Sequence, residues 1–282
     1  MADLDLWTKD SKLSNFADDT QSIIIQDSRE KLMETVQQES KAVTAFFSGV
    51  GLVNNADKAA LLYNSRRKGK AITIEDIGGE TLESKDTEKL LGVTISSNLE
   101  WKNHVDNLCK VLKQRIGLLR RIKYKVNKDK LQIIAEAIFN SKIRYGIAVY
   151  SSPRTGEDEA ENEDMKRIQV LQNDMLRLIN GHTRAEQVNM RTLREDQQIL
   201  SVNQLACYHI ALEMHNVIWR NSSYPLRCYR FRSESRGDLI IPRRPSRGCA
   251  GFSYIGPIIW NKMSKRLREV FEPDPFRTQA LD

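Results

Sequence analysis

Two adjacent carboxylates, Asp18 and Asp19, lie between two short runs of residues that favour β-strands. The segment 14–25 predicts a strand, a tight turn and a second strand, with both aspartates at the tip of the hairpin. Carboxylate oxygens are ligands for Mg²⁺, and a pair of such ions can flank a phosphoryl transfer. Because neighbouring strand residues point to opposite faces, one of the two aspartates should dominate as a ligand. A solvated hairpin tip is the commoner role of such a pair. The rest of the sequence is therefore needed to distinguish a metal-binding pair from a solvated one.

Three further motifs follow this pair in a fixed order along the first half of the chain. They are Gly51-Leu52-Val53-Asn54-Asn55-Ala56-Asp57-Lys58, then Leu90-Leu91-Gly92-Val93-Thr94-Ile95-Ser96-Ser97-Asn98-Leu99-Glu100-Trp101, then Ile143-Arg144-Tyr145-Gly146. Each pattern alone is unspecific. With Phe16-Ala17-Asp18-Asp19, however, they make four motifs in the expected order along the chain. Together they resemble the reverse transcriptases of non-LTR (LINE-type, Jockey-like) retrotransposons, whose aromatic-Ala-Asp-Asp box corresponds to the first motif.

The resemblance implies an RNA-directed DNA polymerase with Mg²⁺ or Mn²⁺ as cofactor and with an RNA template and a DNA primer as partners. In that family a primer 3′ hydroxyl attacks the α-phosphate of a nucleotide while two metal ions stabilise the charge. By resemblance Asp18 and Asp19 are catalytic metal ligands, Asp18 the principal one. Lys58 would neutralise or protonate the departing pyrophosphate. A surface lysine in a loop is the alternative role of Lys58.

The segment Leu91-Gly92-Val93 resembles the primer grip of the family. Its glycine allows a nucleic-acid strand to approach the backbone closely, and it equally allows a plain bend. The family also supplies another carboxylate and the fingers from well upstream of the aspartate hairpin, and Asp3 and Asp5 are too close to replace that carboxylate. We therefore expect the C-terminal portion of a reverse transcriptase, with little or no polymerase activity by itself.

The strongest electrostatic feature lies between positions 110 and 130, where nine Lys or Arg accompany one acid. Apolar residues recur every three or four positions from Trp101 to Ile122 and predict an amphipathic helix with its cations mostly on the other face. The residues that we expect to contact nucleic-acid phosphates are Lys110, Lys113, Arg120, Arg121, Lys123 and Lys125. Such contacts are independent of sequence and sensitive to salt. A merely solvated face is the alternative, and the resemblance favours a thumb that follows the primer–template duplex.

The elements around these residues predict an α+β fold. We expect a partial polymerase palm over 1–99, an antiparallel sheet with a helix, followed by a helical thumb over 100–153. A small, mostly helical C-terminal domain follows over 154–222, then a basic tail with a docked terminal segment over 223–282. Helices are expected at 27–49, 101–122, 128–140, 143–150, 164–180 and 202–220, and strands at 59–63, 71–74 and 89–96. The segment 153–164, which contains six acids, is the expected linker.

The composition limits the remaining possibilities. The chain has 282 residues, of which 40% are hydrophobic and 29% charged, as in globular proteins. An excess of 44 Lys and Arg over 37 Asp and Glu gives a net charge of +7, which suits a polyanionic partner. Four cysteines without zinc-ligand spacing predict free thiols of a reducing compartment. We expect no signal peptide and no transmembrane segment, and hence a cytoplasmic or nuclear protein that does not bind membranes.

Two functions are compatible with these features, and a degenerate open reading frame without selected activity is the third possibility. The first is a fragment of an RNA-directed DNA polymerase, and the second is a non-enzymatic nucleic-acid-binding remnant. The second needs only the basic helix and the tail 224–247, where seven arginines accompany two acids and aromatic residues able to stack on bases. A basic loop without a ligand is the alternative for that tail. The segment 256–263 resembles the C-terminal ending of Jockey-type elements.

Overall fold

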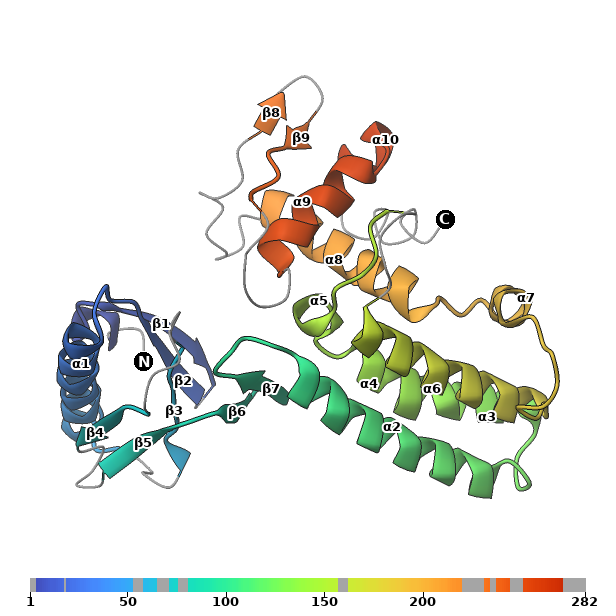
Figure 1. The fold of residues 1–282 in the computed structure, drawn as a ribbon, viewed down its shortest axis with the longest axis horizontal. Coiled ribbons are helices and arrows are strands. Elements are labelled where there is room, and N and C mark those ends of the chain that lie inside the picture. The colour runs from blue at the N-terminus through green and yellow to red at the C-terminus, as the bar shows by residue number, and fades with distance from the viewer. Residues whose placement is uncertain are drawn as a thin grey trace. The chain divides into compact units, whose positions relative to one another are not determined.

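The computed structural model describes residues 4–17, 19–52, 58–64, 71–75, 81–156, 162–219, 231–233, 237–243 and 251–270. Over these residues the fold is mixed α+β, rich in helices and with small sheets, as expected, whereas the assignment of a palm and a thumb stays a prediction. The chain divides into two compact units, Met1–Leu99 and Glu100–Asp282 (Figure 1). Each unit is described separately below.

The first unit opens with the expected hairpin. A short 3₁₀ turn, η1 (Leu4–Leu6), precedes strands β1 (Ser11–Phe16) and β2 (Asp19–Ile24), which pair antiparallel with Phe16 opposite Asp19. Ala17 in the turn has a φ of +54°, as the favoured two-residue hairpin turns require. The hairpin leaves large apolar side chains in solvent, with Phe16 64% and Ile23 56% exposed.

Helix α1 (Arg29–Gly49) begins where the sequence predicts. Its N-cap Ser28 accepts a hydrogen bond from the backbone N–H of Lys31, which satisfies one of the free donors of the first turn. Glu39 fastens the helix to the start of β1, because its carboxylate accepts hydrogen bonds from the backbone N–H groups of Lys9 and Asp10. The Ser11 hydroxyl donates a third bond to the same carboxylate at 2.7 Å.

The remaining strands of this unit correct one expectation. Strand β3 (Leu61–Leu62) pairs in parallel with β5 (Thr81–Lys85), and β5 pairs antiparallel with β4 (Thr73–Glu75). Strands β6 (Thr87–Leu90) and β7 (Val93–Ser96) form a separate hairpin. The described strands thus make three small sheets, one with a parallel pair, where we expected a single antiparallel sheet. Among the described strands of this unit, only β5 pairs along both edges.

The second unit consists mainly of helices. They are α2 (Lys102–Ile122), α3 (Lys128–Ala135), α4 (Ser141–Arg144), α5 (Ile147–Tyr150), α6 (Glu163–Asn180), α7 (Met190–Asp196), α8 (Val202–Trp219), α9 (Phe252–Lys262) and α10 (Lys265–Arg268). A π-helical turn, η3 (Glu136–Asn140), connects α3 to α4, and the expected helix 143–150 is interrupted because Gly146 adopts a φ of +70°. The short strands β8 (Phe231–Ser233) and β9 (Asp238–Leu239) pair antiparallel.

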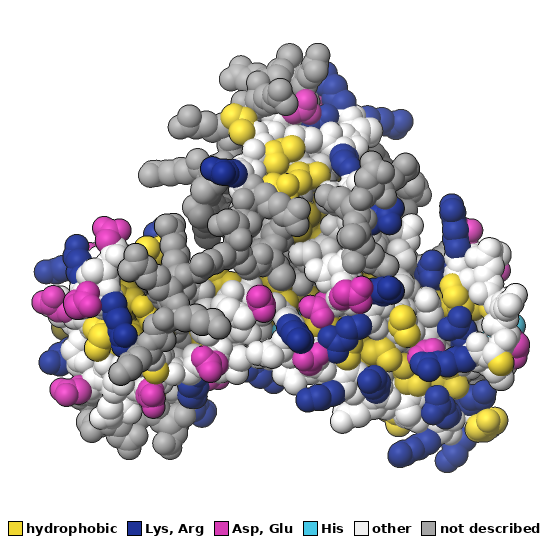
Figure 2. All heavy atoms as spheres, viewed as in Figure 1, with side chains coloured by type: hydrophobic (Ala, Val, Ile, Leu, Met, Phe, Trp, Pro, Cys, Tyr) yellow, Lys and Arg dark blue, Asp and Glu magenta, His cyan; other side chains and the backbone are white. Residues whose placement is uncertain are grey.

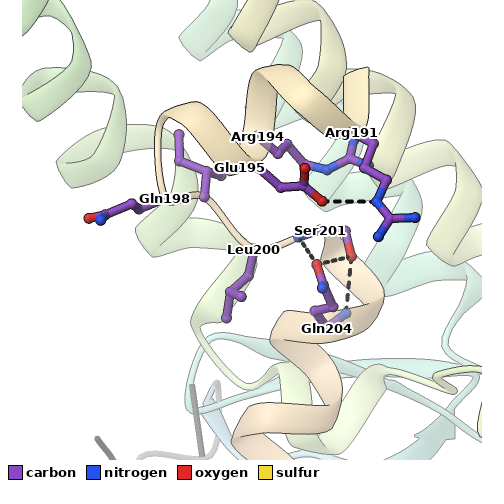
Figure 3. Close-up of a pocket in the computed structure, with 8 residues that line it drawn as sticks. Arg191, Arg194, Glu195, Gln198, Leu200, Ser201 and Gln204 are labelled. Atoms are coloured by element: carbon purple, nitrogen blue, oxygen red, sulfur yellow. Dashed lines mark hydrogen bonds and ion pairs between the residues drawn. The ribbon is translucent and has the colours of Figure 1, made fainter. Parts of the chain in front are cut away.

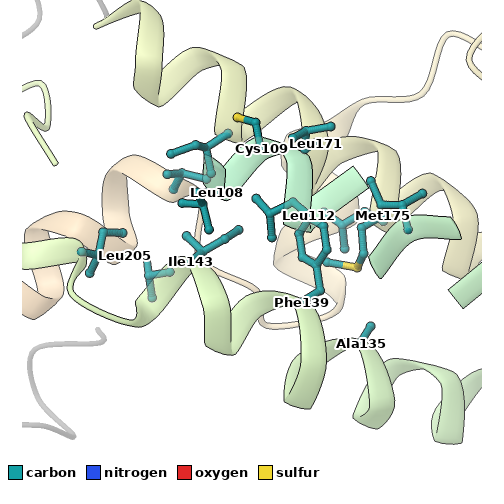
Figure 4. Packing of buried hydrophobic residues seen from close by; sticks show 14 of the residues in the cluster. Leu108, Cys109, Leu112, Ala135, Phe139, Ile143, Leu171, Met175 and Leu205 are labelled. Atoms are coloured by element: carbon teal, nitrogen blue, oxygen red, sulfur yellow. The ribbon is translucent and has the colours of Figure 1, made fainter. Parts of the chain in front are cut away.

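A continuous hydrophobic core extends from Val105 to Ala206. Leu112, Phe139 and Met175 lie at its centre and have no exposed surface (Figure 4). The core therefore includes helices on both sides of the expected linker 153–164, of which residues 157–161 lie outside the described residues. Helices that share a core of this size are held to one another by the hydrophobic effect.

A second cluster joins α8 to the terminal segment. Met214, Leu239 and Trp260 are buried in it, and the indole N–H of Trp260 donates to the carbonyl oxygen of Gly237 at 3.1 Å. Gly256 in α9 packs so closely on α8 that a Cβ atom there would lie 2.5 Å from the Met214 sulfur. A larger residue at position 256 would therefore require the Met214 side chain to shift.

Two cysteines can be compared with the expectation of free thiols. Cys109 is buried and Cys207 half-buried, and both are free, whereas Cys228 and Cys249 lie outside the described residues. Burial raises the pKa of the Cys207 thiol to about 11, so this side chain is a poor nucleophile at neutral pH. Within the described ranges, every helix is too short or too polar to cross a membrane.

Candidate nucleic-acid interface

The residues expected to form a metal site are only partly described. Asp19 begins β2 with an exposed side chain and Lys58 is also exposed, whereas Asp18 lies outside the described residues. The described part of the chain contains no group of three or more His, Cys, Asp or Glu that could hold a metal ion. Of the two expected metal ligands, only Asp19 can therefore be placed, and the metal site stays a prediction.

The expected primer grip forms the turn of the β6–β7 hairpin. Leu91 and Gly92 have φ angles of +44° and +83°, and Leu90 pairs with Val93, which together define a two-residue turn with left-handed backbone. A leucine in this conformation is uncommon and costs free energy. Leu91 and Gly92 at the tip of the turn are solvent-exposed, so a ligand can reach the protein backbone there.

Helix α2 separates apolar and cationic residues. Its buried side is formed by Val105, Leu108, Leu112, Ile116 and Leu119, which face the core. The residues that we expect to contact phosphates lie away from that side. Lys110, Lys113, Arg120, Arg121 and Lys125 are exposed and Lys123 is half-buried. The core therefore holds the helix in place while its cations remain in contact with water.

These cations are not neutralised by neighbouring acids. None of the six makes an ion pair with another residue in the described ranges, whereas the arginines of α6 do. Arg167 pairs with Asp106 and Asp164, and Arg177 lies 3.8 Å from Asp174. Figure 2 shows many Lys and Arg side chains on this face of the second unit, over α2 and its C-terminal end.

Helices α2 and α6 pack against each other and run in the same direction. Arg167 near the start of α6 contacts Asp106 near the start of α2, and their later turns line one cavity together. This cavity, called the end cavity below, has a volume of about 330 Å³. Its charged and aromatic lining consists of Arg120, Lys123, Tyr124, Asp174, Arg177, His182 and Arg184.

The turn that follows α6 closes one side of the end cavity. Gly181 ends the helix with a φ of +77°, as a C-terminal glycine cap does. Arg184 then reaches back and donates from Nε to the Asp174 carboxylate at 2.9 Å, which raises the pKa of Arg184. In the same turn Glu186 accepts hydrogen bonds from the His182 ring and from Thr183, and these bonds lower its pKa to about 2.

The positive charge at the end cavity exceeds the negative partial charge of the two helix C-termini. Each helix C-terminus carries roughly half a negative charge, so two parallel ends attract about one unit of positive charge. The cavity is lined by four cations, Arg120, Lys123, Arg177 and Arg184, against one carboxylate, that of Asp174. An excess of roughly two positive charges therefore remains after both effects are counted.

A larger cavity lies between α7 and α8 and has a volume of about 590 Å³ (Figure 3). Its polar groups mostly bind one another. Arg191 pairs with Glu195 at 2.9 Å, Arg194 donates to Asn173, and Ser201 and Gln204 form a reciprocal cap at the start of α8. This cavity is therefore a weaker candidate for a charged ligand than the smaller end cavity.

Sequence reasoning missed α7 and both cavities. Signals for the helix starts were present, because Asn189 caps α7 and Ser201-x-x-Gln204 is a capping-box pattern. The end cavity has no local signal, since it joins residues of 116–124 to residues of 174–184, which lie 50 or more positions further along the sequence. Comparison of the chain with family models, with curated proteins and with solved structures gives no significant match.

Proposed function

We propose that this chain is the C-terminal portion of a LINE-type reverse transcriptase and that its second unit binds nucleic acid through the cations of α2 and the turn that follows. The observation that carries the proposal is the row of exposed cations without acidic partners on a helix whose opposite side is fixed in the core. The four ordered motifs support the family, and the basic helix supports the kind of ligand.

The spacing of the cations suits a phosphate backbone. A helix rises about 1.5 Å per residue, so Lys110 and Arg121 are separated by roughly 16 Å along α2. This distance corresponds to about five base-pair steps along one strand of a duplex. Several phosphates can therefore be contacted at once, with an affinity that depends on charge and is independent of base sequence.

A second candidate is non-enzymatic binding, which needs only the exposed cations of α2 and the turn that follows it. Primer extension with Mg²⁺ or Mn²⁺ separates the two candidates. We expect no extension by the chain alone, and robust synthesis that is lost on Asp18→Ala would instead establish a complete polymerase site.

Binding is tested by titrating a labelled RNA–DNA duplex over a range of salt concentrations. We expect the double variant Lys110→Ala and Lys113→Ala to bind more weakly and to reduce the salt slope by about two. The control that removes the same number of charges is Lys265→Ala with Arg266→Ala on α10, where both side chains are exposed. Equal losses for the two variants, or binding by wild type that does not depend on salt, would contradict the proposal.

A further inference from the structure

The end cavity combines a cationic lining with an exposed aromatic ring. Tyr124 is 83% exposed, although it directly follows the last turn of α2. The Lys123 ammonium lies 5.2 Å from the centre of the Tyr124 ring and therefore covers one face of it. A tyrosine held in this way at the rim of a basic cavity offers its other face to a planar ligand.

We propose that the end cavity takes one phosphate of a nucleic-acid strand together with the unpaired base next to it, which stacks on Tyr124. This inference rests on the proposed function, because it assumes that the basic end of α2 meets nucleic acid. The ligand proposed for the end cavity differs from the duplex of the proposed function. A paired base is already stacked within a duplex, so only an unpaired base can present its face to Tyr124.

The charges of the lining suit a phosphate. Arg120 and Lys123 make no ion pair within the described residues, so their charge is available to a ligand. Arg177 also lines the cavity, where it lies 3.8 Å from the Asp174 carboxylate that Arg184 shares. Arg184 is held by Asp174 and therefore fixes the cavity wall rather than the ligand.

The size of the cavity limits the ligand. About 330 Å³ lies at the lower end of the range for small-molecule sites, which fits one nucleotide and excludes a duplex. Free nucleotides and inorganic phosphate share this chemistry with a strand. The strand is favoured because the cavity opens beside the cations of α2, so the neighbouring phosphates of the same strand find further partners there.

The test compares a blunt RNA–DNA duplex with the same duplex carrying a short unpaired tail, using the full chain. We expect Tyr124→Ala to weaken binding of the tailed duplex roughly tenfold and to leave the blunt duplex unchanged. Tyr124→Phe should bind both like wild type, since stacking does not need the hydroxyl. A tail of abasic sites should abolish the difference between wild type and Tyr124→Ala.

Two neighbouring arginines provide a matched pair for the phosphate. Arg120 lines the end cavity and Arg121 does not, although both are exposed in the last turn of α2. Arg120→Gln should weaken the tailed duplex more than the blunt one, whereas Arg121→Gln should weaken both equally. Inorganic phosphate or a mononucleotide could also compete with the tailed duplex as strongly as the unpaired tail alone does. That result would assign the cavity to the free ligand and would contradict the proposal that it binds a strand.

Failure of this inference differs from failure of the proposed function. If Tyr124→Ala binds both duplexes like wild type while Lys110→Ala with Lys113→Ala weakens both, the end cavity is not a nucleotide site. Equal weakening of both duplexes by Tyr124→Ala also overturns it. If wild type binds neither duplex, both hypotheses fail. A tail with a photoreactive uridine should crosslink to Tyr124, and crosslinks elsewhere without this one would contradict the placement.

Discussion

The guanidinium of Arg167 donates to the carboxylate of Asp106 at 2.5 Å, and this contact joins α6 to α2. A second acid, Asp164, holds the same arginine at 3.1 Å from within its own helix. The pair lies near the start of both helices, which run in the same direction, so their C-terminal ends also lie together. Because both side chains are about 40% exposed, the pair adds little free energy, and the shared core holds the two helices and the cations at their other end in place.

Truncation of a side chain at the centre of the second unit's core should lower the free energy of unfolding. Leu112→Ala removes a side chain with no exposed surface and should lower the free energy of unfolding by about 3 kcal/mol, from lost burial and the cavity left behind. Leu118→Ala, on the other side of the same helix and 39% exposed, should change it by less than about 0.5 kcal/mol. Urea denaturation followed by circular dichroism measures both, and similar losses would contradict the packing.

Two glycines should respond in opposite directions to the same substitution. Gly256→Ala places a Cβ 2.5 Å from the Met214 sulfur and should lower the free energy of unfolding by about 1–2 kcal/mol. Gly117→Ala meets no atom within 4 Å and should raise it by about 0.5–1 kcal/mol, because alanine favours the helix. Thermal unfolding of the two variants checks the signs. A smaller residue at Met214 should partly rescue Gly256→Ala.

Mild acid should destabilise the second unit through His104. This ring is 8% exposed and packs on the ring of Tyr150, and burial lowers its pKa. The unfolded chain therefore takes up this proton first as the pH falls below about 6.5, so the free energy of unfolding decreases with falling pH. Urea titrations at neutral and mildly acidic pH should show a smaller decrease for His104→Gln.

His209 should contribute to the same decrease, because burial and then the charge of Arg144 lower its pKa. The double variant with His104→Gln and His209→Gln is therefore expected to have the flattest pH profile. A double variant with the pH dependence of wild type would contradict both assignments.

Glu39 should stabilise the first unit above the pKa of an ordinary carboxylate. Burial opposes its ionisation, yet hydrogen bonds from Ser11, Lys9 and Asp10 hold its pKa below the usual value. The stabilisation is thus present above about pH 4.5 and is lost as the pH falls below that value. Glu39→Gln should weaken the link between α1 and β1 by about 1–2 kcal/mol at neutral pH. Hydrogen exchange of the α1 amides measures this, and unchanged protection would contradict it.

Local patterns were sufficient for most elements of the fold. The hairpin around Asp19, the helices α1, α2, α6 and α8, and the glycine cap at Gly181 all follow from caps and periodicity. The parallel pairing of β3 with β5 did not, because a two-residue strand carries no directional signal. The interruption at Gly146 was also missed, since an apolar run does not distinguish one helix from two short ones.

The candidate site was only partly accessible to sequence reasoning. The cations of α2 follow from spacing, because their positions on a helix are fixed by its period. The end cavity needed the turn after α6 to fold back on Asp174, which no local pattern encodes. Asp18 lies outside the described residues, so the metal hypothesis depends on the motif resemblance and on the proposed extension assay.

Strands β1 and β2 pair only with each other among the described residues, and they carry Phe16 and Ile23 at the surface. Their outer edges consequently keep backbone donors and acceptors that another chain is able to use. A concentrated solution should therefore become turbid through strand addition between copies. A charged residue at Ile23 should keep such a solution clear.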